Sequence, residues 1–315
     1  MQVASASPTA TNPIKRAVRW LDEYTSPRAN TAGNFKEANY FQATFQGATE
    51  GFYLMGPMGV LAGAGSAVAG SFVQNKTGNQ LLGVLTGTAM GAGLGAAAGA
   101  FGGTALGTAA ILGGLLGGFQ TIRSHGQSSI RDAGGNATMI SAFFMDGPSK
   151  IAGGIGAAAG AKCKNPWAKA LMGAAVGAAT GATLAAVGFA PVSVTMAAAG
   201  CGLAGAVGPF FGPRFSQFFR NVAEDAGMGI DKVQSSITDR PMSEKTRNAV
   251  GAVPAAFVKE GLRGFMYSDG GLSGFIIGGT MESIQQAHIM FFSQKEEKQN
   301  QELGDQTARL AAQAA

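Results

Sequence analysis

Residues 81–122 read LLGVLTGTAMGAGLGAAAGAFGGTALGTAAILGGLLGGFQTI, and this stretch decides the fold. It contains no charged side chain, and glycine recurs in it at every fourth position: Gly83, Gly87, Gly91, Gly95, Gly99, Gly103 and Gly107. Helical residues four apart lie on one face. The pattern therefore predicts a helical furrow without side chains, in which a neighbouring backbone packs closely.

Such a furrow favours lipid over water as the surroundings of the helix. A glycine in a helix interior costs about 1 kcal/mol relative to alanine in water, so a soluble helix with this many glycines would be unstable. In a bilayer a helix must keep its backbone hydrogen bonds, and small residues spaced four apart form a recognised packing face. We predict an all-α, membrane-embedded glycine-zipper bundle of two repeated helical hairpins with amphipathic flanking helices.

The composition and the distribution of charge agree with this interpretation. Of 315 residues, 50 are glycine and only 13% are charged, whereas soluble proteins average about 25% charged residues. Residues 51–213 carry seven basic and two acidic side chains, placed between apolar runs. Basic loops beside apolar segments are typical of contact with anionic lipid headgroups, while nucleic-acid binding needs a dense basic stripe. We predict a lipid bilayer as a partner and no nucleic acid.

The glycine pattern occurs a second time. Gly173, Gly177 and Gly181 repeat the four-residue spacing of the first stretch, and Gly147-Pro148 echoes Gly56-Pro57. We therefore predict a duplicated core with repeats at 51–122 and 135–213, and two similar units about a pseudo-two-fold axis. The hairpins would turn near Gly102-Gly103 and Pro191, and one long helix through Gly102 is the alternative.

Four regions are expected. Residues 1–50 are a polar leader and an amphipathic helix, 51–213 the membrane core, 214–293 an amphipathic helical region, and 294–315 a polar tail. Charge placement predicts four spanning helices with both termini on the basic side. The helix after Pro13 lies on a membrane surface or docks on its own protein, with docking favoured. Docking is also favoured over a span for residues 270–289.

No motif for catalysis, cofactor binding or metal binding stands out. Gly91-x-Gly93-x-x-Ala96 has the letters of a dinucleotide-binding fingerprint, but no strand precedes it. Two cysteines and two histidines are too few for a disulfide framework or a Cys/His metal site. We predict no enzymatic activity and no cofactor, and the glycines at 83–107 and 173–181 are assigned to helix packing.

One stretch resembles a known family. It comprises Lys164-Asn165-Pro166-Trp167, then Gly173-Ala174, Gly177-Ala178 and Leu184-Ala185-Ala186. It is similar to the Lys/Pro-Trp loop and Gly-Ala-rich third helix of the mitochondrial inner-membrane preprotein translocase channel family and its chloroplast amino-acid and preprotein transporter relatives. The resemblance implies a membrane-embedded translocase-like unit. Ala142 stands where the family has an arginine ahead of Asp146, so no functional residue is carried over.

Two classes of function follow from these patterns. The first is a membrane bundle for passage or insertion of a protein or solute, in an organellar inner membrane or after secretion by a non-Sec route into a target membrane. The uncharged first twelve residues resemble the unstructured leader of type III secretion substrates, which favours the secreted version. The second is a non-transporting scaffold that assembles with itself or with a membrane-protein partner, and a soluble assembly protein is a further alternative.

Overall fold

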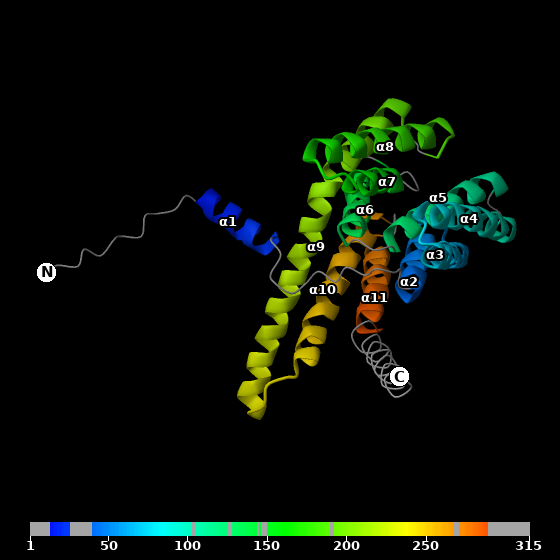
Figure 1. Cartoon of the computed structure of the whole chain (residues 1–315). Coiled ribbons are helices and arrows are strands. Elements are labelled where there is room, and N and C mark those ends of the chain that lie inside the picture. Colours follow the sequence, from blue (N-terminus) through cyan, green and yellow to red (C-terminus); the bar gives the residue numbers. More distant parts are fainter. Residues whose placement is uncertain are drawn as a thin grey trace, which may run out of the picture.

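The computed structural model describes residues 13–25, 40–102, 105–124, 128–143, 145, 150–189, 192–267 and 271–288. These residues form eleven helices and no strand, so the all-α prediction is confirmed (Figure 1). The helices are α1 (Pro13–Thr25), α2 (Tyr40–Met55), α3 (Pro57–Thr77), α4 (Gln80–Gly102), α5 (Leu106–Ser124), α6 (Ser128–Ser141), α7 (Lys150–Ala161), α8 (Pro166–Ala186), α9 (Val194–Thr238), α10 (Glu244–Tyr267) and α11 (Leu272–His288). The predicted leader at 1–12 and tail at 294–315, with Gly103, Pro191 and Gly147-Pro148, lie outside the described residues.

The helices form two bundles that α10 and α11 connect (Figure 1). In the first bundle α2, α3, α4 and α5 pack against one another, and in the second α6, α7, α8 and α9 do so. α10 packs against both α9 and α11, and α11 contacts α2. This pair of helices therefore joins the two bundles at one end of the molecule.

Local sequence signals set the ends of the helices that carry the glycines. Gly78 adopts a left-handed conformation with φ 64° at the end of α3, a region that glycine enters without steric cost. The next residue, Asn79, accepts a hydrogen bond from Leu81 N at 2.9 Å and so caps α4. Asn165 caps α8 in the same way, with Trp167 N donating at 2.8 Å.

The two glycine-rich stretches form separate helices rather than one rod. α4 ends at Gly102 and α5 begins at Leu106, so the alternative of a single long helix is excluded. α4 and α5 run antiparallel, because Gly87 faces Gly117 and the later Gly91 faces the earlier Gly113. α8 and α9 are antiparallel as well.

The number of candidate spans differs from the four expected. Among the described residues three helices are long and apolar enough to cross a membrane: α4, α8 and α9. α5, expected to be the second span of the first hairpin, is not among them. It has 19 residues and its last turns carry Gln120, Thr121 and Arg123, which lower its hydropathy.

α9 also crosses the expected domain boundary after Pro213. It is a continuous helix of 45 residues that contains Pro209 and Pro213, and at 1.5 Å per residue it is about 68 Å long. A proline removes one backbone donor, and here Asn136 Nδ2 donates to the carbonyl of Gly212 at 2.8 Å beside the prolines. The change from apolar to charged composition therefore occurs within one helix.

The two flanking helices of uncertain role both dock on the protein. Tyr24 of α1 donates its hydroxyl to Asp225 of α9 at 2.7 Å, and the Tyr24 ring lies 6.1 Å from that of Phe218. α11 packs along α10. Docking, the favoured alternative for α1, is what the structure shows, and the preference for docking over a span at residues 270–289 stays a prediction.

The contact between α6 and α9 gives a test of the fold. A Cβ at Gly212 of α9 would overlap the Asp132 carbonyl and come within 2.6 Å of Ala133 Cα, whereas open space surrounds Gly229 of the same helix. We expect Gly212→Ala to lower the free energy of unfolding by about 1–3 kcal/mol, and Gly229→Ala to raise it by up to about 1 kcal/mol. Denaturant unfolding of the purified protein in detergent measures both, and equal effects would contradict this contact.

Candidate functional site

The predicted packing glycines of α4 lie along its contact with α5. A Cβ added at Gly91 would overlap the carbonyl of Gly113, one at Gly87 would overlap Thr121 and lie 2.7 Å from the Gly117 carbonyl, and one at Gly95 would overlap the Ala109 carbonyl. The two backbones thus touch directly. A side chain at any of these positions would have to separate the helices.

The glycines of α8 are placed in the same way against α9. Gly173 faces the carbonyl of Gly205, Gly177 that of Cys201, and Gly181 that of Ala197. Gly173, Gly177 and Gly181 are all buried. α7 adds a third backbone to this contact, because a Cβ at Gly156 would lie 2.5 Å from the carbonyl of Gly173.

Two predicted glycines, Gly83 and Gly107, differ from this arrangement. Gly83 packs on α3 rather than α5, where a Cβ would lie 2.6 Å from Gln74 Cβ. Gly99 is buried. Gly107 is exposed, and no atom of the described residues lies near the position of its Cβ, so the structure shows no helix contact at it. The reason is that α5 begins at Leu106, and Gly107 lies in its first turn, before the contact with α4 begins.

Large apolar side chains lie on the opposite, exposed faces of these helices. On α4, Leu81 and Leu85 are 66% and 55% exposed, and on α8, Trp167 and Leu171 are 79% and 68% exposed. A soluble protein buries its large apolar residues and keeps such exposed patches small. Here the smallest residues face inward and the large apolar ones face outward.

The N-terminal ends of α4 and α8 lie together. Lys162 Nζ, in the turn before α8, donates to Gln80 Oε1 at the start of α4 at 2.8 Å. Lys76 and Lys164 are exposed in the neighbouring turns. Both glycine-rich candidate spans therefore begin at the same basic end of the molecule.

A second feature, which the sequence reasoning missed, is a group of buried charges where α2 and α5 meet α10 and α11. We call Glu50, Arg123, Glu260, Arg263 and Glu282 the junction cluster. Arg123 NH1 donates to Glu50 Oε1 at 2.7 Å, and Arg263 pairs with the same oxygen. Arg263 NH1 also lies 3.0 Å from Glu260 Oε2. One carboxylate thus holds together three helices: α2, α5 and α10.

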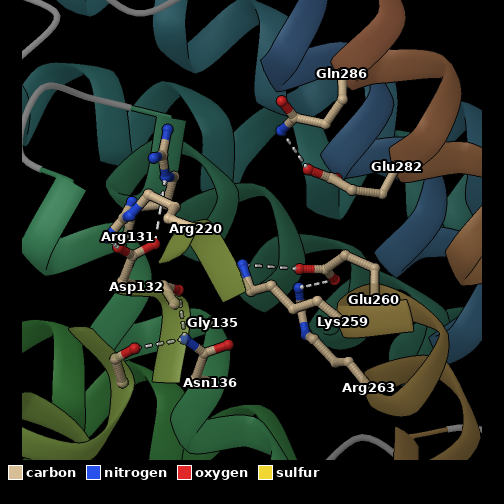
Figure 2. Close-up of polar contacts among 12 residues, drawn as sticks. Arg131, Asp132, Gly135, Asn136, Arg220, Lys259, Glu260, Arg263, Glu282 and Gln286 are labelled. Carbon is tan, nitrogen blue, oxygen red and sulfur yellow. Dashed lines mark hydrogen bonds and ion pairs between the residues drawn. The ribbon is translucent and has the colours of Figure 1, made fainter. Parts of the chain in front are cut away.

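Glu260 has charged neighbours on both sides, as Figure 2 shows. Lys259 Nζ lies 3.4 Å from Glu260 Oε1, and on α11 Glu282 accepts a hydrogen bond from Gln286 at 3.0 Å. Burial raises the pKa of the Glu260 carboxyl; the charge of Glu282 raises it further, while Lys259 and Arg123 lower it without reversing the direction. Burial likewise raises the pKa of the Tyr53 phenol, with a further contribution from Glu260.

Two glycines make room for the Tyr53 side chain where α2 meets α10 and α11. Its hydroxyl lies in the space that a side chain at Gly264 of α10 or at Gly278 of α11 would fill. From there it donates to the Gly274 carbonyl at 3.1 Å. α2 is therefore fastened to both α10 and α11 beside the junction cluster.

A separate polar contact joins α6 to α9 (Figure 2). Arg220 NH2 lies 3.0 Å from Asp132 Oδ2, and Asn136 Nδ2 donates to Ser216 Oγ at 2.9 Å. This contact is within one bundle. It is separate from the junction cluster and has its own pair of complementary charges, Asp132 and Arg220.

The described residues contain no group of three or more His, Cys, Asp and Glu side chains that could hold a metal ion. Comparisons with protein-family models, with curated proteins and with solved structures found no match to this chain. The likeness to the translocase channel family stays a prediction.

A matched pair of substitutions tests the contact of α4 with α5. We expect Gly91→Leu to destabilise the protein by about 3 kcal/mol, because the side chain must displace the backbone of α5. Gly93→Leu, two residues away with open space around it, should change stability by less than about 0.5 kcal/mol. Unfolding titrations in detergent compare the two variants. If both behaved alike, the inward face of α4 would be assigned wrongly.

Proposed function

We propose that this chain is an integral membrane protein that takes part in passage or insertion of a protein or solute across a membrane. The observation that carries the proposal is the reversed distribution of side chains on α4 and α8. Glycines make most of the internal contacts, and Leu81, Leu85 and Leu171 point outward. Lipid tails solvate such leucines, and close backbone packing is a favourable way for helices to associate in lipid.

The dimensions and the charges support a bilayer position. α8 has 21 residues, which is about 31 Å of helix, close to the thickness of about 30 Å of a hydrocarbon core. The lysines at the first ends of α4 and α8, with Trp167 beside them, match the basic and aromatic residues that flank spans at the headgroup level. We infer that this end faces anionic headgroups.

The two hairpins support an internal repeat. α4 with α5, and α8 with the first part of α9, are antiparallel pairs in direct backbone contact through glycines. We propose that these glycine-zipper pairs arose by duplication and enter the bilayer as two similar units. Transport proteins are often built from such repeats, with the working site at their interface.

Labelling from the two sides of a membrane tests the bilayer position. In a chain with Cys163→Ser and Cys201→Ala, one cysteine is placed at Lys164 or at Val187, the two ends of α8. In sealed vesicles, a membrane-impermeant thiol reagent should reach one position from outside and the other only after the vesicles are opened. Equal labelling of both positions in sealed vesicles would overturn the membrane proposal.

Vesicle flux tests passage separately. Purified protein reconstituted into vesicles is expected to release a trapped dye at a rate that rises with the protein-to-lipid ratio. Gly93→Leu serves as the matched control for Gly91→Leu, and only the latter should alter release, because it opens the contact of α4 with α5. If the labelling shows insertion but no dye is released, the protein inserts into the membrane without providing a path through it.

A scaffold is the second candidate, and one observation favours it. The backbones of α4 and α5 are in contact over several turns, so this part of the chain encloses no lumen. The outer face of α4 also carries small exposed residues four apart, Ala89, Gly93 and Ala97. A homo-oligomer or a membrane-protein partner would then be bound there. Cross-linking in vesicles that shows a stable oligomer and no dye release would favour this candidate.

A further inference from the structure

A water-sized cavity lies inside the junction cluster. Its volume is about 20 Å³, and Glu50, Glu260 and Glu282 line it together with Arg123 and Arg263. A buried water needs about 10–15 Å³ of such space and two to four polar partners. The site is therefore large enough and polar enough for one water molecule, and three carboxyl groups surround it.

The hydrogen bonding of Glu50 is uneven. Its Oε1 atom accepts from both arginines, whereas its buried Oε2 atom has no hydrogen-bond partner among the described residues. Gln46 of α2, which also lines the cavity, contributes a second buried atom without a hydrogen-bond partner among the described residues, its Oε1. Buried polar atoms are nearly always satisfied in proteins, by ordered water where no side chain serves. These atoms indicate a polar ligand in the joint.

We propose that the junction cluster is a proton-binding site: one water molecule occupies the cavity, and the Glu260 carboxyl takes up one proton from solvent when α10 and α11 seat against α2 and α5. The step neutralises one carboxylate, and it breaks no covalent bond and needs no further reactant. The proton has a route, because the side chains of Glu260 and Lys259 remain 14% and 21% exposed.

The groups that face Glu260 come from every helix packed around the cavity. α2 contributes Glu50 and Tyr53, α5 Arg123, α11 Glu282, and α10 itself Lys259 and Arg263. On α7, Lys150 Nζ lies 3.5 Å from the carbonyl of Met266, further along α10. On α6 and α9, Asp132 and Arg220 pair with each other.

The placement of the carboxyls explains what the proton does. Glu260 belongs to α10 and Glu282 to α11, and both line one cavity. Like charges across a small buried space cannot both ionise without cost. A proton on Glu260 removes this repulsion and leaves Glu50 to hold the two arginines, which outweighs the weakening of the ion pairs that Glu260 makes with Lys259 and Arg263. Proton release would instead loosen α10 from α11, and with them one of the connections between the two bundles.

The direction of the pH dependence follows from linkage. The folded state holds the Glu260 proton more tightly than the unfolded chain, because burial raises the pKa of this carboxyl above the ordinary value of 4.5. The resulting stabilisation is fully present below pH 4.5. It is lost as the pH rises through the folded-state pKa.

Infrared spectroscopy of the full chain in detergent tests the proposal. A protonated carboxyl gives a carbonyl band that is separate from the bands of carboxylates and that shifts in heavy water. We expect this band for the wild-type protein, its disappearance as the pH is raised, and its loss in Glu260→Gln. Glu244→Gln, at an exposed position in the first turn of α10, is the control and should keep it.

Two neighbouring substitutions sharpen the test because they act in opposite directions. Glu282→Gln removes a negative neighbour and should move the midpoint of the band to lower pH, while Lys259→Met removes a positive neighbour and should move it to higher pH. Shifts of the same sign, no band in the wild type at any pH at which it is folded, or a band that survives Glu260→Gln would each overturn the proposal. The band is read without a membrane, so the result does not depend on whether the chain conducts anything.

Discussion

Direct contact between helix backbones is the constraint on which the rest of the structure depends. At Gly91 and Gly113, and again at Gly173 and Gly205, two helices approach so closely that even a methyl group would not fit between them. This contact brings Cα–H groups against carbonyl oxygens, each a weak interaction, and gains dispersion along the whole seam. Glycine destabilises each helix on its own, so the hairpins gain their stability from the pairing, and the surroundings must keep the helices formed.

The same constraint determines where the large side chains and the charges lie. Because glycine fills much of the inner faces, most of the large apolar side chains of α4 and α8, Leu81, Leu85 and Leu171 among them, lie on the outside. A charge within the seam would force the backbones apart, and ionised groups are instead concentrated at the ends of the hairpins and where the bundles meet α10 and α11. The molecule thus separates an apolar part, in which small residues make the internal contacts, from a polar part, in which charged side chains make them.

The features that sequence reasoning predicted are those encoded within one or two turns of helix. Four-residue spacing marked the packing faces of α4 and α8, and Gly102 marked the end of a helix. The boundary expected after Pro213 follows a change of composition, and it falls inside α9, which continues past both prolines. The junction cluster was missed because its members lie as far apart in the sequence as Glu50 and Glu282, and only the packing of four helices brings them together. One signal was present: Glu50 is the only charged residue between Glu37 and Lys76, and an isolated charge in an apolar helix requires a partner.

The contrast between the two kinds of contact also indicates where the structure can change. A seam of backbone against backbone has no side chain to rotate, and close-packed contacts of this kind shift between discrete arrangements rather than deform gradually. The hairpins are therefore expected to move as rigid units.

The junction cluster differs, because Glu50 must balance two arginines and a small cavity separates three carboxyls. Removing one partner of a buried ion pair typically costs about 3–5 kcal/mol, so a change of charge here is large on the scale of protein stability. α10 and α11, the helices that carry most of these groups, thus offer a polar connection between the two bundles, beside the direct contact of α5 with α6 and α7.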